Sequence, residues 1–459
     1  MIPVKRFLGP FFICALASVA EGAIVSTGDV LVVDRGFRSL PIPLGPGDTN
    51  TGSENGVFVA PGGELRVDGG SQLSTGQFTQ DAGQVVVSGA GSRITVNRSR
   101  VEAGQFGHDS APGTTAVMVI EDGGAVVIED PEGLCVNRGE CFIGQIGNAA
   151  GSTVAVTIRG EGSILDTDLD TSPQTTIIGD TSVFTLEEDG FDFGVPGGST
   201  QTLVRVSSGG TLETGDTWVA QGREGPETVI ATVIVEGAGS SWNANAIGVG
   251  FHESDSSAPG TLGSIIVTDR ATVRTAGGLF VGAGGFVGGD GEISGDVFNF
   301  GGIVAPGTSP GNLTIDGDFR MSSGVVELEI GGIGVGLFDS LSVAGLVEIT
   351  GGEILFDFVD DFVPDVDDLL ELIVSDGGVS IADAVTYSYR GLDAAFNFSL
   401  DASGRLLASV ADVPEPASFG LLAFGIALLS WRSRSNVQKK YALVSAKTSR
   451  RGCSTAPVA

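Results

Sequence analysis

Acidic side chains are the most abundant groups in this sequence that could do chemistry, and three of them alternate at Asp166, Asp168 and Asp170. Alternate residues of an extended segment point to the same side, so these carboxylates could hold Ca²⁺, which prefers oxygen ligands. The segment lacks the glycine and the distal glutamate of an EF-hand loop. A solvated acidic loop is the simpler interpretation. We therefore expect no cofactor, with a calcium site at this triplet as the alternative.

Thiol chemistry is confined to one pair in the central part of the sequence, because Cys14 and Cys453 lie near its ends. Cys135 and Cys141 flank the short segment 136–140. In an oxidising compartment we expect this pair to form a disulfide that closes a small loop, and two free thiols are the alternative. No histidine stands near the pair, so a zinc site is not expected.

The two histidines, His108 and His252, are candidates for general acid–base chemistry. Each precedes a Ser-Ala-Pro-Gly-Thr sequence, at 110–114 and 257–261, so both recur with a structural repeat. Enzymes that cleave polysaccharides bring several carboxylates together with Arg, Lys or His on one face. Residues 21–431 contain no lysine, and the two histidines are far apart in the chain. We expect a protein without enzyme activity, and a polysaccharide lyase or hydrolase is the alternative.

The distribution of charge excludes one class of partner. Residues 21–431 hold all 56 acidic residues and only fifteen basic ones, every one of them an arginine. Contacts to a phosphate backbone need a basic surface, so we expect no binding of nucleic acid. A surface this acidic keeps a protein soluble and attracts divalent cations.

The elements that carry these residues follow a repeat rich in glycine, which occupies 73 of 459 positions. Short runs of alternating Val, Ile and Leu end at Gly-Gly or Gly-Ser turns, as in 65–70 and 85–92, and apolar-Gly-x-x-Gly corners follow, as in 103–107 and 142–147. The turns recur at irregular steps, at positions 69, 91, 123, 162, 209, 239 and 270.

No single unit of this repeat could bury its own apolar side chains, whereas stacked units would form a continuous core. Residues 24–300 are therefore predicted to form a parallel β-helix, or β-solenoid, in an all-β fold. An array of β-sandwiches is the alternative, because alternation alone does not fix the direction in which strands pair.

From residue 301 the pattern changes. Segment 302–315 contains a Pro-Gly-Thr-Ser-Pro-Gly turn before a strand, and over 301–352 the sequence resembles the passenger β-helices of autotransporters. The resemblance implies a further β-helical rung near the end of the solenoid. The remainder of the region 301–411 contains further strands, which we expect to form a β-rich C-terminal cap over the open edge of the solenoid.

Residues 1–20 have the three parts of a secretory signal peptide. Lys5 and Arg6 form its basic start, residues 7–19 form an apolar stretch, and small residues precede the expected cleavage site after Ala20. We therefore expect an N-terminal signal helix and export from the cytoplasm.

The C-terminal region carries the most specific pattern of the sequence. Val413, Pro414, Glu415 and Pro416 precede an apolar run, and a basic cluster begins at Arg432. The prolines end any preceding strand and hold the motif extended. The apolar run is shorter than the ~20 residues of an ordinary membrane span, so it crosses only by recruiting its flanks or by thinning the bilayer.

Basic residues favour the cytoplasmic side of a membrane, so we expect a transmembrane helix within 413–434 and a basic cytoplasmic tail at 435–459. The order of motif, apolar run and basic cluster resembles the PEP-CTERM sorting domain of exported bacterial proteins. The resemblance implies that an exosortase, a membrane-embedded sorting enzyme, recognises Pro414, Glu415 and Pro416 and removes the segment during delivery to the surface. Family members usually end soon after the basic cluster, and the tail found here either is harmless or impedes cleavage. A plain single-span anchor is the alternative.

These patterns predict an exported structural or adhesion protein of the cell surface or the extracellular (biofilm) matrix, anchored in the inner membrane before processing. Its expected partners are an exosortase-type enzyme and an extracellular polysaccharide. A polysaccharide-active β-helix enzyme and a calcium-dependent matrix assembly protein are the alternative functions.

Overall fold

In the computed structural model of the chain, the described residues run from 23 to 410 with gaps. Within them the chain is all-β, with 32 strands in one sheet and two further sheets of two strands each. The ranges left out are 26–29, 40–55, 60–63, 76, 81–82, 98–102, 107–114, 130–141, 147–152, 168–174, 181, 188–189, 197–199, 223–227, 253–260, 309, 366–367, 369, 393–395 and 402–403.

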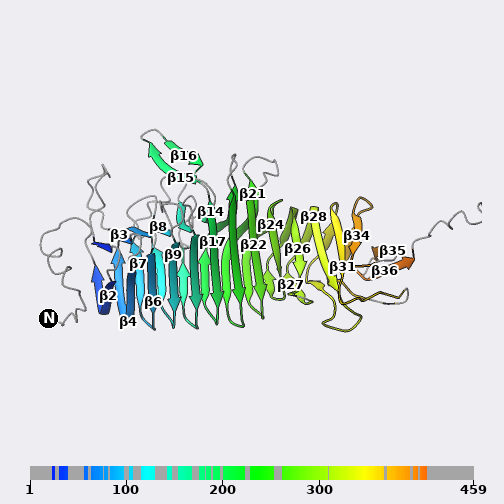
Figure 1. Ribbon diagram of the computed structural model, residues 1–459, viewed down its shortest axis with the longest axis horizontal. Helices are drawn as coiled ribbons and strands as arrows, with labels where there is room; N and C mark the ends of the chain where they lie inside the picture. Colours follow the sequence, from blue (N-terminus) through cyan, green and yellow to red (C-terminus); the bar gives the residue numbers. More distant parts are fainter. Residues whose placement is uncertain are drawn as a thin grey trace, which may run out of the picture. The chain divides into compact units, whose positions relative to one another are not determined.

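The large sheet is a solenoid in which each coil contributes a strand to each of three faces, here named A, B and C (Figure 1). A strand pairs in parallel with the equivalent strands of the coils before and after it. The pairing confirms the predicted parallel β-solenoid, and the alternative of a β-sandwich array is wrong.

The strands of the three faces are as follows. Face A contains β6 (Gly83–Ser88), β9 (Thr115–Glu121), β12 (Thr153–Arg159), β17 (Thr200–Ser207), β20 (Val229–Glu236), β22 (Thr261–Thr268), β24 (Gly285–Gly289), β31 (Glu353–Phe358) and β34 (Thr386–Arg390). Face B contains β7 (Arg93–Asn97), β10 (Ala125–Glu129), β13 (Ile164–Asp166), β18 (Thr211–Thr214), β25 (Glu292–Ser294), β27 (Asn312–Asp316), β29 (Ser340–Val343) and β32 (Ile373–Ser375). Face C contains β1 (Ala23–Val25), β3 (Gly56–Val59), β5 (Gln77–Gln80), β8 (Ala103–Phe106), β11 (Phe142–Ile146), β14 (Thr175–Asp180), β19 (Asp216–Gly222), β30 (Val347–Ile349) and β33 (Val379–Ile381).

Six longer strands bend around a corner and belong to two faces. From A to B run β2 (Val30–Ser39) and β4 (Glu64–Thr75); from B to C run β21 (Ser241–His252) and β23 (Thr272–Val281); from C to A run β26 (Val297–Pro306) and β28 (Phe319–Ile330). Outside the solenoid sheet, β15 (Ser182–Glu187) and β16 (Gly190–Pro196) form an antiparallel hairpin, and β35 (Phe396–Leu400) pairs with β36 (Leu406–Val410).

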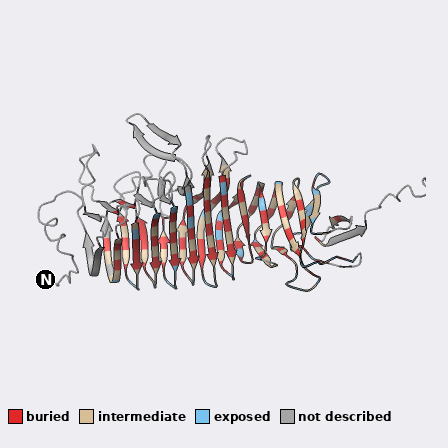
Figure 2. Ribbon diagram, in the orientation of Figure 1, coloured by how far each residue is buried: buried red, intermediate tan, exposed pale blue. Residues whose placement is uncertain are grey.

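The core consists of columns of inward side chains that continue from coil to coil, seen as red bands that alternate with tan along the strands (Figure 2). Burying each such side chain stabilises the fold by about 1.5–3 kcal/mol, and part of that contact is made with neighbouring coils. The stack therefore has to form as a unit. One inward column of face A contains Leu65, Val85, Met118, Val156, Val204, Val233, Ile265, Val287, Val304, Val326 and Ile354, each at most 1% exposed.

The turns between faces A and B lie at the glycine positions that the sequence indicates. All seven predicted turn residues have a left-handed backbone, with φ between +63° and +86°. Glycine adopts this conformation without strain, which explains its density here. At the seventh turn Arg270 takes the place of glycine, at φ +64°.

Every second one of these turns has the sequence Gly-x-Gly-Ser and ties three coils together. The serine is buried, and its hydroxyl accepts a hydrogen bond from a backbone N–H in the turn of the preceding coil. The first glycine donates its N–H to the following coil, as from Gly160 to Ser207 O at 3.2 Å. The three serine bonds are Gly70 N to Ser92 Oγ at 3.1 Å, Gly123 N to Ser163 Oγ at 3.0 Å and Gly209 N to Ser240 Oγ at 3.0 Å.

The corner that carries the longer connections changes along the solenoid. Up to β22, faces A and B are joined by tight turns, whereas long connections such as 253–260 link face C to face A. From β24 onwards, face C runs directly into face A, and the longer connections 331–339 and 359–372 join A to B. This switch accounts for the change of sequence pattern after residue 300.

Parallel stacking continues beyond the region where the sequence indicated a change. Strand β31 pairs in parallel with β28, and β34 pairs in parallel with β31, so the solenoid extends to residue 390. Phe398 of β35 then packs against Phe356, Phe358 and Tyr389 of the last two coils, as a cap does. The expected signal helix, transmembrane helix and tail lie outside the described residues.

Candidate functional site

The acidic triplet of the sequence is only partly placed. Asp166 ends β13 on the outer side of face B, in register with Glu213 of the next coil, while Asp168 and Asp170 lie outside the described residues. Among the residues that the structure describes, no group of three His, Cys, Asp or Glu side chains is arranged to hold a metal ion. The calcium site therefore stays a prediction.

The sulfur and imidazole candidates also fall largely outside the described ranges. Cys135 and Cys141 belong to the connection between β10 and β11, and His108 follows β8. His252 is the last residue of β21 on face C, in register with Gly222. Three strands of face C separate β21 from β8, which corresponds to about 19 Å at a strand spacing of ~4.8 Å.

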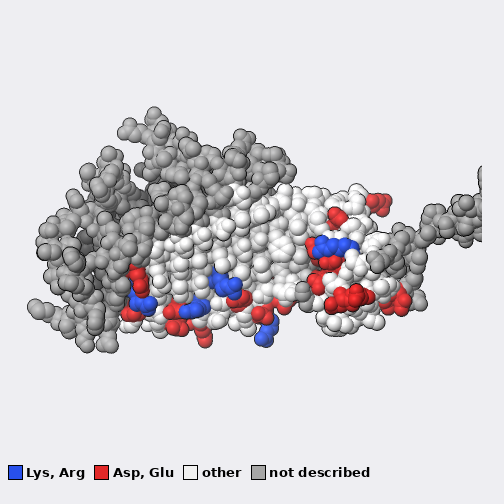
Figure 3. Space-filling view, in the orientation of Figure 1, with Lys and Arg blue, Asp and Glu red and all other residues white. Residues whose placement is uncertain are grey.

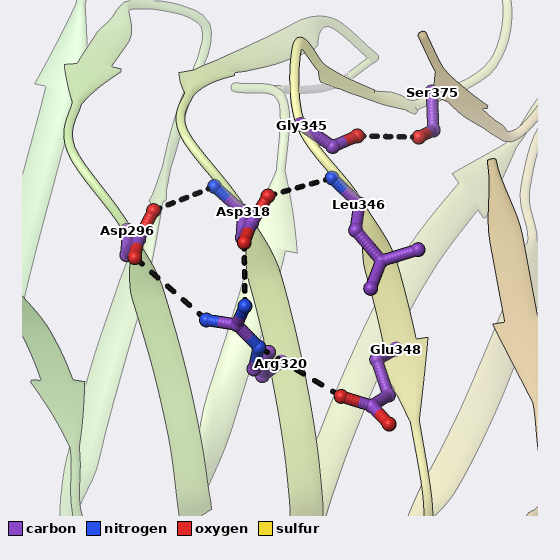
Figure 4. A network of polar contacts seen from close by, with 7 residues as sticks. All are labelled: Asp296, Asp318, Arg320, Gly345, Leu346, Glu348 and Ser375. Atoms are coloured by element: carbon purple, nitrogen blue, oxygen red, sulfur yellow. Dashed lines mark hydrogen bonds and ion pairs between the residues drawn. The ribbon is translucent and has the colours of Figure 1, made fainter. Parts of the chain in front are cut away.

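The densest described group of polar contacts surrounds Arg320 on face C (Figure 4). Its guanidinium bonds Asp318 at 2.5 Å and lies 3.7 Å from both Asp296 and Glu348. The acids come from the coils on either side and from its own coil, so one cation links three consecutive coils. The arginine side chain stays 38% exposed, so each ion pair is screened and contributes little by itself.

The aspartates of this group also accept hydrogen bonds from backbone N–H groups. Asp296 accepts a hydrogen bond from Asp318 N at 2.8 Å, and Asp318 accepts one from Leu346 N at 2.7 Å. In the next coil, Ser375 donates to Gly345 O at 2.6 Å (Figure 4). Asp296 and Asp318 thus each fix the turn of the following coil, Ser375 binds back to the turn of the preceding coil, and the cluster acts as a clamp along the stack.

Aromatic rings extend this group along the outside of face C and its corner with face A. Phe280 and Phe298 occupy adjacent coils in register, and their rings stack with centroids 5.0 Å apart. Phe300 lies 6.3 Å from both, and Arg320 covers Phe298 at 5.6 Å. Because the rings face one another, each neighbour covers part of the flat surface that a sugar ring would need.

This site was not predicted from the sequence, although a recurring pair of residues marks it. Gly295 and Asp296 recur as Gly317 and Asp318 one coil later, each pair two residues before an outward residue of face C. The recurrence is recognisable only when the coil length is known, because the coils of the solenoid differ in length.

Two further charged groups lie in the last coils. Arg390 on the outer side of face A donates a hydrogen bond to Asp357 at 2.7 Å and another to Glu327, and the bond to Asp357 raises the pKa of Arg390. Asp339 is 4% exposed and accepts hydrogen bonds from Gly311 N and Glu329 N, both at 2.8 Å. Burial raises the pKa of Asp339 to about 6, against the effect of these two bonds.

The outer side of face A has a different character. Figure 3 shows it as a broad area without charged side chains, with opposite charges gathered near its lower edge and at one end. The edge charges are paired across coils: Arg159 bonds Glu121, and Arg205 bonds Glu236 at 2.7 Å. The chain thus offers two kinds of surface, an ionic clamp on face C and an uncharged sheet on face A.

No helix long and apolar enough to cross a bilayer occurs among the described residues, and the apolar run before Arg432 lies beyond them.

Comparison with models of known protein families found a match near the C-terminus. The family model of the PEP-CTERM protein-sorting motif matches residues 412–435, which include Val413, Pro414, Glu415 and Pro416. No curated protein matched the chain.

Proposed function

Since the chain carries a PEP-CTERM sorting motif, which marks it as an exported protein sorted by an exosortase-type enzyme, we propose that it is a structural or adhesion protein of the cell surface or extracellular matrix. In this proposal the motif holds the chain in the inner membrane until the exosortase removes it. The β-solenoid is the part that remains at the surface, where extracellular polysaccharide is its expected partner.

Two observations together support the proposal. The chain carries a sorting motif, and the polar side chains of its solenoid bind the backbone of the solenoid itself. The buried serines bond turn backbones, and the aspartates near Arg320 do the same on face C. A stack built this way presents repeated, fixed surfaces, which suits display and adhesion.

The experiment for sorting is fractionation of producing cells with and without the exosortase. We expect the chain to lose its C-terminal segment and reach the surface only when the enzyme is present. The variant Glu415→Ala should stay unprocessed, whereas Pro457→Ala, a change in the tail, should behave as the native chain. Equal processing of all forms in both strains would contradict the proposal.

A polysaccharide-active enzyme is the second candidate, because three carboxylates converge on Arg320 as such chemistry requires. We favour the structural role since two of these carboxylates are already bonded to backbone N–H groups. We expect the purified chain to leave the length of the producing cells' polysaccharide unchanged, with or without added Ca²⁺. Shortening that disappears in Arg320→Gln would establish the enzyme instead.

A further inference from the structure

The outer side of face A between β9 and β26 forms a predominantly apolar surface, which we call the apolar face. Side chains on alternate positions of seven consecutive strands make up this surface, and they lie in register from coil to coil. The large ones reach well into solvent: Leu262 is 53% exposed, and Leu203 and Ile303 are each 37% exposed. Ile234 and Ile266 lie between them and are half-buried.

Charged side chains lie mostly around the apolar face and are nearly absent from it. The chain has a net charge of −32, yet in the three outward columns that start at Thr115, Val117 and Val119 of β9, Arg205 is the only charged residue as far as β26. Arg205 is neutralised by Glu236 of the next coil. Two copies of the chain repel each other through most of their acidic surface, and this face is where that repulsion is weakest.

The size of the face is that of a protein interface. Seven strands at ~4.8 Å and about six residues at ~3.3 Å give roughly 700 Å². A standard interface buries about 800 Å² per partner, and an ordinary monomer exposes no apolar patch above about 300–600 Å². Part of this area belongs to threonine, serine and glutamine side chains, and the whole face is close in size to one side of a standard interface.

We propose that the apolar face binds a second copy of this chain, face to face, in a two-fold symmetric pair. Two flat sheets pack well at about 10 Å, with their side chains interdigitated, and a symmetric pair needs only one self-complementary surface. A polysaccharide fits less well, because the most exposed side chains of the face, Leu203, Leu262 and Ile303, offer no hydrogen-bond partner; its hydroxyls are Thr115, Thr153, Thr157, Thr232 and Ser264. The pairing goes beyond the proposed function and does not depend on the sorting step.

The test uses the full-length chain in its producing cells. A photoactivatable cross-linking residue replaces Thr232 on the apolar face or, as a control, Val374, which is 41% exposed on β32 of face B. We expect irradiation to give a homodimer from the first position and none from the second. Cross-links from Thr232 only to another protein or to glycan, or no cross-link at all, would overturn the proposal.

A second experiment introduces a charged side chain on the apolar face. Leu262→Glu would bury two unpaired carboxylates in the pair and should lower the dimer yield from Thr232 by about tenfold or more. Val374→Glu is the matched control and should leave the yield unchanged. Because Leu262 is exposed, its replacement should preserve the resistance of the solenoid to protease. If it does not, Ile303→Glu takes its place, and an unchanged yield in a folded variant would refute the pairing.

Discussion

Replacing Ser163 by alanine tests whether the Gly-x-Gly-Ser turns hold neighbouring coils together. Ser163 Oγ accepts the hydrogen bond from Gly123 N at 3.0 Å and donates one to Arg159 O at 2.7 Å, and the residue is fully buried. In Ser163→Ala the N–H of Gly123 loses its acceptor inside the protein, which costs about 1–3 kcal/mol. We therefore expect the free energy of local opening to fall by about 2 kcal/mol.

Amide hydrogen exchange followed by mass spectrometry measures this opening directly. A loss of about 2 kcal/mol corresponds to exchange faster by roughly thirtyfold in peptides that contain Gly123 or the turn 160–163. Coils far from the turn should keep their protection, because each coil of a solenoid contacts only its neighbours. Ser264→Ala, at a half-buried outward position of β22, is the control and should change exchange by less than about twofold.

The outcome that would refute this reasoning is unchanged exchange at Gly123 in the folded Ser163→Ala variant. It would mean that the strand ladders alone fix the turns. Equal loss of protection in every coil would also contradict it, since the bond would then act on global unfolding.

Three other changes test separate parts of the solenoid. The raised pKa of Asp339, about 6 against an ordinary 3.8, means that its contribution of up to about 3 kcal/mol is present below pH 3.8 and is lost as the pH rises through 6. The difference in urea unfolding between the native chain and Asp339→Asn should therefore change between pH 5 and 7.5, and a constant difference would contradict it. Trp242→Phe removes the bond to Thr214 Oγ1 and part of a buried ring, and should cost about 2 kcal/mol in the same assay. Non-reducing peptide mapping should find Cys135 linked to Cys141, and free thiols there would contradict the predicted disulfide.

The parts of the fold that depend on local backbone chemistry could be predicted from the sequence. Glycine marks left-handed turn residues, so six of the seven turns between faces A and B could be predicted from their glycines. The seventh turn, at Arg270, was predicted from the alternating strand residues before it. The sorting motif was accessible for the same reason, because its parts are adjacent in the chain. The Arg320 clamp was not, since it depends on which residues of successive coils stand in register, and the coils differ in length.

Connections in the solenoid explain why face A stays available to a partner. In the coils up to β22 the longer connections leave from the corner between C and A, and in the last coils they leave from the corner between A and B. The middle strands of face A pair only with the equivalent strands of the neighbouring coils, and no other described strand pairs with them. Apolar contact across such a face should therefore compete only with long-range repulsion between two acidic chains.

This competition makes the dependence on salt informative. Raising the ionic strength from about 0.01 to 0.15 M shortens the Debye length from ~30 Å to ~8 Å, which is less than the ~10 Å between packed sheets. Repulsion between the two copies then weakens, while the apolar contact is unaffected or strengthened. The homodimer cross-linked from Thr232 should accordingly increase with NaCl in membranes isolated from the producing cells. A decrease would show that ion pairs hold the copies together, and that Arg205 and the acids at the edge, not the apolar side chains, form the contact.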